Sequence, residues 1–176
     1  KLMIVPLFGF GLLGNYYFGL QVISILSIIP GVIFTYILPQ DASGKSTNKL
    51  KIITVLGSVI LAILGVFLAP IVVPMIFPEY KESISLIPIL SISIIPSTIS
   101  SMYTSKFLGK EKSSYVVIGY IISTIVLVLG ILILTEIFQV VGLAIAYVLS
   151  ASVLAIFLIS INYLKRSYFG EKLNDG

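Results

Sequence analysis

Side chains that could carry acid–base or metal chemistry are scarce in this sequence. Cysteine and histidine are both absent from its 176 residues, which excludes thiolate catalysis, thiolate metal sites and imidazole bases. All seven acidic residues are expected in connections between apolar stretches or in the tail: Asp41, Glu79, Glu82, Glu111, Glu136, Glu171 and Asp175. We therefore expect no paired carboxylates between helices, no metal, no cofactor and no enzymatic activity. A membrane glycosyltransferase would need acids clustered at one membrane face.

Hydroxyl and amide side chains are the remaining polar groups, and they lie inside the apolar stretches. Five of them share one face of a helix at spacings i, i+4, i+7, i+8 and i+11: Ser93, Ser97, Ser100, Ser101 and Thr104. A second row contains Ser91, Thr98 and Ser105, and an earlier stretch carries Tyr17, Gln21 and Ser24. Such residues either let membrane helices pack closely or line a cavity that passes a hydrated headgroup.

Two glycine motifs resemble phosphate-binding loops but lack the required context. Residues 9–14 (GFGLLG) match a dinucleotide pattern without a preceding strand or a following acid, so we interpret them as a flexible turn between two spans. Residues 43–46 (SGKS) resemble the end of a P-loop, but Pro39 occupies the position of the first glycine. We expect no nucleotide at either place.

The polar rows lie within a very apolar chain. Hydrophobic residues make up 58% of it, charged residues 10%, and the mean hydropathy is +1.15. Five stretches free of charge each reach the roughly 20 residues that a helix needs to cross a bilayer: 16–38, 52–77, 84–105, 115–134 and 140–164. The sequence therefore predicts an all-α, polytopic integral membrane bundle of about five helices.

Basic residues predict how these helices are oriented. They concentrate in alternate connections and near the C-terminus: Lys45, Lys49, Lys51, Lys106, Lys110, Lys112, Lys165 and Arg166. The positive-inside rule places these segments, and the tail 165–176, in the cytoplasm. The simplest role of these residues is to orient the chain and to contact anionic headgroups. A substrate pyrophosphate is the alternative ligand.

Prolines inside the first three stretches predict kinks, because proline removes one helical hydrogen bond and clashes with the preceding turn. The candidate hinge residues are Pro30, Gly31, Pro70, Pro88 and Pro96, and Pro74 lies near the second kink. Broken helices line cavities or act as bending points in transporters, although proline is also common in membrane helices generally.

Several short segments together resemble the C-terminal part of a polysaccharide exporter. They are 12–17 (LLGNYY), 37–39 (ILP), 76–80 (IFPEY) with 87–90 (IPIL), and 141–147 (VGLAIAY). Their order and spacing are similar to those of the O-antigen or oligosaccharide-lipid flippases of the multidrug, oligosaccharidyl-lipid and polysaccharide (MOP) exporter superfamily. Pro78 stands where that family usually has glycine.

The resemblance implies one half of a two-bundle fold, a plasma-membrane location and alternating access. It also implies a lipid-linked oligosaccharide as substrate, for surface polysaccharide or glycan biosynthesis. We expect the chain to be a fragment, residues 1–176 forming a partial C-terminal bundle, with 1–6 ending a preceding helix. Its partner would be an N-terminal bundle of the same polypeptide or another subunit. A multidrug or lipid II exporter, or a non-transporting scaffold or remnant, remains the alternative.

Overall fold

The computed structural model describes the backbone of residues 4–171 and the side chains of 14–80 and 83–164. Helices account for 91% of the structure, and the described residues contain no strand. The elements are α1 (Ile4–Leu26), α2 (Ile28–Ala42), α3 (Asn48–Ile76), the 3-10 helix η1 (Pro78–Ser85), α4 (Leu86–Ile92), α5 (Ile94–Leu108), α6 (Ser113–Phe138) and α7 (Val140–Glu171). The predicted all-helical class is confirmed.

Among the described residues, four helical segments are long and apolar enough to cross a membrane: Asn48–Ile76, Ser83–Leu108, Ser113–Phe138 and Val140–Leu164. A fifth span arises if Gly14–Leu26 and Ile28–Ala42, which meet at an angle of 52°, count as one broken crossing. The prediction of about five spans therefore holds only with that bent pair included.

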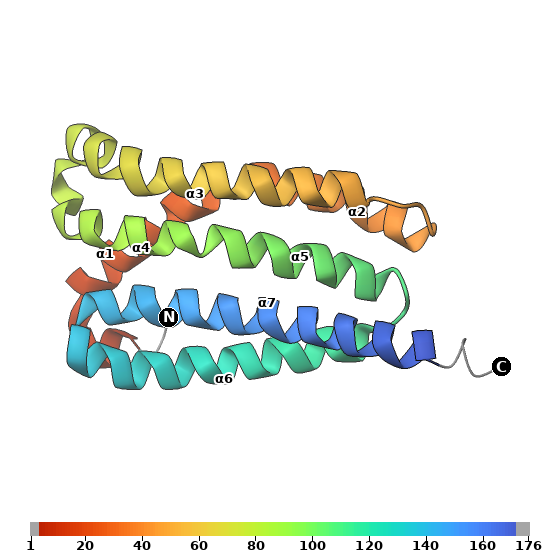
Figure 1. Cartoon of the computed structure of the whole chain (residues 1–176). Helices are drawn as coiled ribbons and strands as arrows, with labels where there is room; N and C mark the ends of the chain where they lie inside the picture. Colours follow the sequence, from red (N-terminus) through yellow and green to blue (C-terminus); the bar gives the residue numbers. More distant parts are fainter. Residues whose placement is uncertain (1–3, 172–176) are drawn as a thin grey trace.

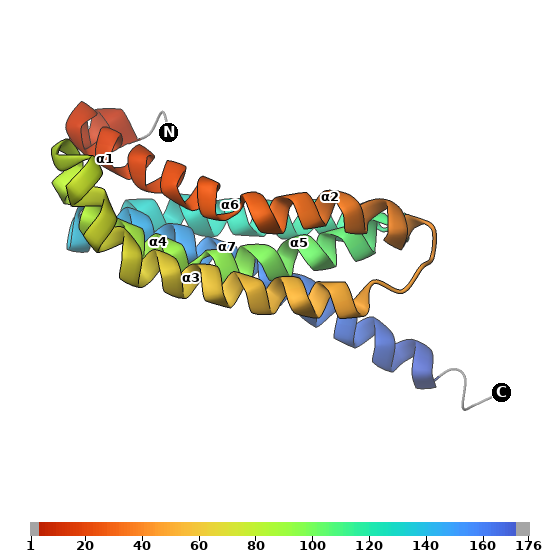
Figure 2. The ribbon, with the colours of Figure 1, turned by 90° about the horizontal axis from the view of Figure 1, so that it is seen from above.

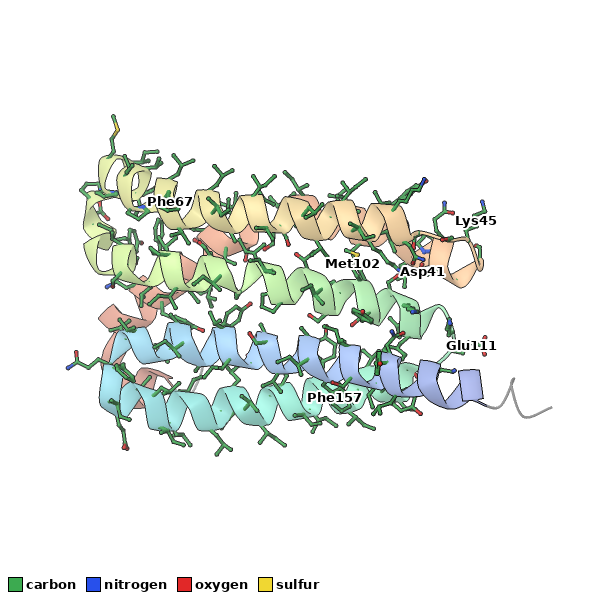
Figure 3. All side chains as sticks on the ribbon, viewed as in Figure 1. Asp41, Lys45, Phe67, Met102, Glu111 and Phe157 are labelled. Carbon is green, nitrogen blue, oxygen red and sulfur yellow. The ribbon has the colours of Figure 1, made fainter. Side chains whose placement is uncertain are left out.

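The long helices form a layer with one bent span across its back. Figure 1 shows α3, the α4/α5 pair, α7 and α6 side by side, with α1 and α2 behind them, and Figure 2 shows the same arrangement from above. α5 packs against α2, α3, α6 and α7. Half of the most apolar stretch of α4/α5 is buried, but only 11% of that of α6. Large apolar side chains project outward along the layer (Figure 3).

Both broken spans share one tetrapeptide that the sequence pattern alone did not single out. Residues 27–30 and 93–96 read SIIP, and 85–88 read SLIP. α1 ends at Leu26 and α4 ends at Ile92, each four residues before a proline. Proline has no amide hydrogen for the carbonyl four residues back, so one helical hydrogen bond is missing at each of these points. A new helix then begins directly after each serine.

The hinge predictions thus divide into three groups. Pro30 and Pro96 lie in the first turn after a break, beside Gly31 in the first case, and Pro88 lies in the first turn of α4. Pro70, like Pro74, lies inside α3, which continues as one helix through both prolines. α3 packs through small or short side chains spaced along one face: Thr54, Ser58, Ala62, Gly65, Ala69 and Val73.

The bent span is held at both ends. Near one end, Phe18 of α1 stacks on Tyr80 of η1 with ring centroids 4.2 Å apart, and the Ser83 hydroxyl donates a 2.9 Å hydrogen bond to the Asn15 carbonyl. At the other end, α2 is joined to α3 and α5 by polar contacts around Asp41. The break at Ser27 lies between these two attachments.

Three boundary predictions were wrong. Residues 9–14 are helical within α1 rather than a turn, since α1 begins at Ile4. α2 continues to Ala42, so Asp41 belongs to a helix rather than to a loop. Residues 4–6 belong to α1 and continue into it rather than ending a preceding helix. α7 continues as a helix to Glu171, within the segment predicted as the tail, and 172–176 and 1–3 lie outside the described residues.

Candidate functional site

A polar cleft of about 420 Å³ lies between α1, α5 and α7. Its lining combines tyrosine, glutamine and serine with two apolar side chains: Tyr17, Leu20, Gln21, Ile23, Ser24, Ser27, Ser97 and Tyr147. None of these side chains is charged at neutral pH. Hydroxyl and amide groups both donate and accept hydrogen bonds, so the cleft suits a neutral ligand with many hydroxyl groups.

Both helix breaks border this cleft. Ser27 is the residue between α1 and α2, and Ser97 lies one turn after the break at Ser93. The Ser97 amide bonds to the Ser93 carbonyl at 3.0 Å, which starts α5. A change in the 52° bend at Ser27 would therefore move residues that line the cleft.

The structure separates the predicted polar residues into two groups. Tyr17, Gln21, Ser24 and Ser97 meet in the cleft, although they come from two spans. The remaining members of the first row do not line it, and most bond to their own helix. Ser93 donates to the Leu90 carbonyl at 2.6 Å, Ser100 to Pro96 at 2.9 Å and Ser101 to Ser97 at 2.9 Å.

Thr104 is the exception in that row. Among the described side chains, its hydroxyl oxygen is buried without a hydrogen-bond partner. The second row is entirely buried, with Ser91 against Gly65 of α3: a Cβ placed on Gly65 would lie 2.2 Å from the Ser91 hydroxyl. These contacts are those of close helix packing.

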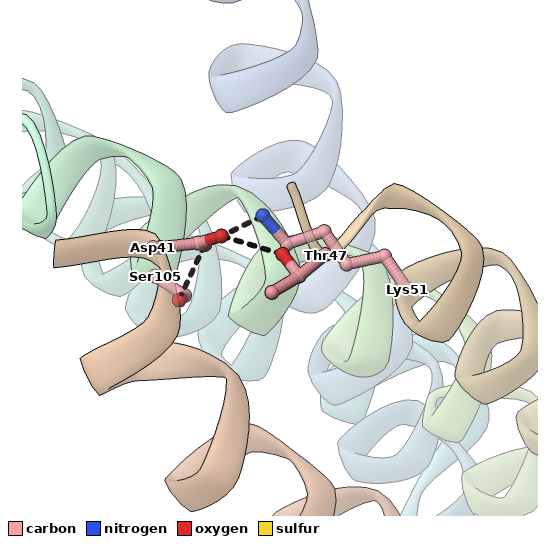
Figure 4. A network of polar contacts seen from close by, with 4 residues as sticks. All are labelled: Asp41, Thr47, Lys51 and Ser105. Carbon is pink, nitrogen blue, oxygen red and sulfur yellow. Dashed lines mark hydrogen bonds and ion pairs between the residues drawn. The ribbon is translucent and has the colours of Figure 1, made fainter. Parts of the chain in front are cut away.

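A second polar cluster lies at the end of the bundle where α2, α3 and α5 meet (Figure 4). The Asp41 carboxylate accepts hydrogen bonds from Thr47 at 2.5 Å, Lys51 at 2.5 Å and Ser105 at 2.8 Å. The Asp41 side chain is only 9% exposed and that of Lys51 15%. We call these four residues the Asp41 cluster. Its donors compensate the carboxylate for lost water.

Glycine allows this close approach. A Cβ on Gly109 would lie 2.8 Å from the Asp41 carbonyl carbon and 2.9 Å from the Ala42 nitrogen, so only glycine fits between the ends of α5 and α2. Ser105, one turn earlier on α5, reaches the Asp41 carboxylate. Lys51, predicted as a membrane-surface cation, is paired with Asp41 in the cluster.

The other predicted basic residues share this end of the bundle. The α2–α3 and α5–α6 connections lie there with the end of α7, and Figure 3 shows Lys45 near Asp41 and Glu111. The connections carry Lys45, Lys110 and Lys112, while Lys49 lies in the first turn of α3 and Lys106 in the last turn of α5. Lys165 and Arg166 belong to the last turns of α7, but their side chains lie outside the described residues. Glu79 in η1 and Glu136 near the end of α6, which was predicted to lie in a turn, belong to the opposite end of the bundle.

Several residues of the cleft and of the Asp41 cluster were not predicted from the sequence. Tyr147 lies on α7 with Ser150 and Ser152 close behind it, and its place beside α1 and α5 follows from helix packing rather than from a pattern in the sequence. Ser105 and Asp41 are 64 positions apart, and nothing local predicts their contact. The repeated SIIP segments were a usable signal for Ser27.

The side chains that the structure describes include no group of three acidic residues able to hold a metal ion. No protein-family model, curated protein or solved structure matches this chain. Arguments about function therefore rest on the cleft, the breaks and the surfaces themselves.

Proposed function

We propose that the chain is part of a membrane flippase or exporter that moves lipid-linked oligosaccharide by alternating access. It works without enzymatic chemistry, together with a second helical bundle of the same polypeptide or of a partner subunit. The observation that carries the proposal is the uncharged, hydroxyl-lined cleft between α1, α5 and α7, which borders both helix breaks. The product would serve surface polysaccharide or glycan biosynthesis.

The cleft supports a sugar as the transported group. Tyr17, Gln21 and Ser97 offer hydroxyl and amide groups at the surface of a bundle that is otherwise apolar. Polar residues inside membrane spans are costly unless they contact water, another helix or a ligand. A ligand rich in hydroxyl groups matches them, whereas a charged drug would find no opposite charge among the lining residues.

The breaks support movement. α1 contacts η1, and α2 contacts α3 and α5. A change of the 52° angle between α1 and α2 would rotate these two segments relative to each other about Ser27. Broken helices with exposed backbone line the transport path in many transporters. The bend therefore connects the cleft to a change in access.

Transport in proteoliposomes tests the proposal. The protein that contains this chain is reconstituted with a fluorescent lipid-linked oligosaccharide, and its movement is followed by accessibility to an external glycosidase. Gln21→Leu removes an amide from the cleft and should slow transport about tenfold, as expected for one lost hydrogen bond. Ser152→Ala is the control, because Ser152 bonds to the Val148 carbonyl at 2.8 Å and does not line the cleft.

Equal transport rates for Gln21→Leu and Ser152→Ala would show that the cleft is not part of the transport path. Transport of lipid II or of a drug in place of the oligosaccharide would indicate a different exporter of the same superfamily. No transport of any of these would favour a non-transporting scaffold.

The proposal includes a plasma-membrane location with the basic end and the C-terminus in the cytoplasm, as the positive-inside rule expects. Because the chain has no cysteine, Ser46→Cys, Ser113→Cys and Glu136→Cys can be labelled singly with an impermeant maleimide. Positions 46 and 113 should react only from the cytoplasmic side and position 136 only from outside. Labelling of position 46 from outside would reverse the orientation.

A further inference from the structure

A second cavity lies on another face of α5, apart from the cleft. It is a groove of about 550 Å³ between α3, α5 and α7, near the basic end of the bundle. The lining comprises Asn48, Lys51, Ile52, Val55, Leu56, Ile99, Met102, Tyr103, Lys106 and Ile159. α3 and α7 lie on either side of α5 in Figure 1, and four of the lining residues come from α5. None of these residues lines the cleft.

The groove changes character along its length. Asn48 and Lys51 on the first turn of α3, and Lys106 near the end of α5, give it one polar, basic end. From there toward the middle of the bundle the groove is apolar. Ile52 and Leu56 line it on α3, and Ile99 and Met102 line it on α5. Ile52 is 61% and Leu56 60% exposed, so the groove opens at the side of the bundle rather than at its end.

The start of α3 adds to the positive potential at the basic end. Its N-cap residue Thr47 makes no side-chain bond to the first amides of the helix, because its hydroxyl donates to Asp41 instead. The N-terminus of a 29-residue helix attracts anions. Asp41 pairs with Lys51, and Lys106 lines the same opening of the groove.

We propose that this groove binds one anionic glycerophospholipid of the surrounding bilayer. Its phosphate lies at the basic end, against Lys106, Asn48 and the start of α3, and one acyl chain lies along the apolar part. The sideways opening favours a bilayer lipid, whose remaining chain can stay in the membrane. The site is independent of the proposed transport, since it shares no lining residue with the cleft.

Native mass spectrometry of the detergent-purified protein tests this site with dioleoyl phosphatidylglycerol as the probe and dioleoyl phosphatidylcholine as the neutral comparison. We expect one phosphatidylglycerol to bind more tightly than phosphatidylcholine. Lys106→Gln should raise its dissociation constant about fivefold, as one lysine near a membrane surface contributes. Lys110→Gln, four residues later and outside the groove, should change it less than about twofold.

A second pair of variants tests the apolar part without altering charge. Leu56→Trp places a larger ring in the groove, and Ile60→Trp places the same ring one turn further along α3, outside it; both residues are 60% exposed, so neither change disturbs the core. Only Leu56→Trp should weaken phosphatidylglycerol binding.

Three results would overturn the assignment. Equal weakening by Lys106→Gln and Lys110→Gln would mean diffuse attraction to the basic end, and equal binding of the two phospholipids would mean that no anion site exists. Displacement of phosphatidylglycerol by a tenfold lower concentration of undecaprenyl phosphate would assign the groove to a polyprenyl carrier instead.

Discussion

The α6–α7 hairpin and the two broken spans show how differently equally apolar segments can behave. α6 and α7 are unbroken, pack closely along their length and are linked by a 2.9 Å hydrogen bond from the Ser123 hydroxyl to the Ser150 carbonyl. The α1/α2 and α4/α5 spans instead stop four residues before a proline, and the cleft lies beside those breaks. α6 and α7 contain no proline, so proline rather than overall hydropathy separates the unbroken hairpin from the interrupted spans.

The largest predicted loss of stability is at the turn of the α6–α7 hairpin. A Cβ on Gly142 would lie 2.2 Å from the Leu134 carbonyl oxygen, a backbone atom that no side-chain rotation can move away. Gly142→Val should therefore lower the free energy of unfolding by about 3 kcal/mol or more. Thermal unfolding in detergent measures it. Gly57→Val is the control, since a Cβ there meets no atom within 4 Å; equal losses would contradict a tightly packed hairpin.

The second-largest predicted loss of stability follows removal of the Asp41 carboxylate, which attaches the bent span to α3 and α5. Asp41→Asn leaves the Lys51 ammonium, 15% exposed, without its carboxylate. An unpaired buried charge costs several kcal/mol, and the partial exposure of Lys51 reduces this to about 2 kcal/mol of unfolding free energy.

Glu111→Gln changes an exposed acid at the same end of the bundle and should cost less than about 0.5 kcal/mol. The double variant Asp41→Asn with Lys51→Met should recover part of the loss. Equal stability of the Asp41 and Glu111 variants would show that the Asp41 cluster does not hold α2 in place.

Replacing the proline after a break should have a smaller effect. It should change the transport rate rather than the stability of the fold. Pro30→Ala or Pro96→Ala restores an amide hydrogen that can bond to the carbonyl four residues back, about 1 kcal/mol in favour of the straight helix. Transport in proteoliposomes should slow about fivefold, with membrane insertion unchanged. Pro70→Ala, inside the continuous α3, should leave the rate unchanged. Unchanged transport in both break variants would exclude the breaks as moving parts.

The smallest predicted effect is a gain in the stability of the α6–α7 hairpin. Gln139, between α6 and α7, has φ = 50° and ψ = −127°, a backbone conformation that side chains rarely adopt. Gln139→Gly should raise the unfolding free energy by about 1 kcal/mol because glycine adopts positive φ without strain. Thermal unfolding again provides the measurement, and a loss of stability would contradict this description of the turn.

Hydropathy predicted the spans well because an apolar helix of about 20 residues is the only simple structure for such stretches in lipid. It could not locate the breaks, because Pro30 and Pro96 interrupt a helix where Pro70 does not. The difference lies in the residues around each proline. A new helix begins after Ser27 and after Ser93, neither of which makes a side-chain cap bond, whereas small side chains pack α3 against its neighbours.

The candidate site was predictable only in part. The row of Tyr17, Gln21 and Ser24 was visible as a helical spacing, and Ser97 belonged to another visible row. Which member of that row faces the cleft depends on how α5 is rotated after the break at Ser93. Tyr147 and the contact of Ser105 with Asp41 depend on tertiary packing and left no local pattern.

The central claim is that the bent span moves relative to a rigid hairpin. Double electron–electron resonance can test it directly, because the chain has no cysteine and spin labels can be placed at exposed positions. Val32→Cys with Ile156→Cys spans α2 and α7, and Ile125→Cys with Ile156→Cys stays within the hairpin. Lipid-linked oligosaccharide should shift the distance distribution of the first pair and leave the second unchanged. Identical distributions with and without the ligand for both pairs would contradict the claim.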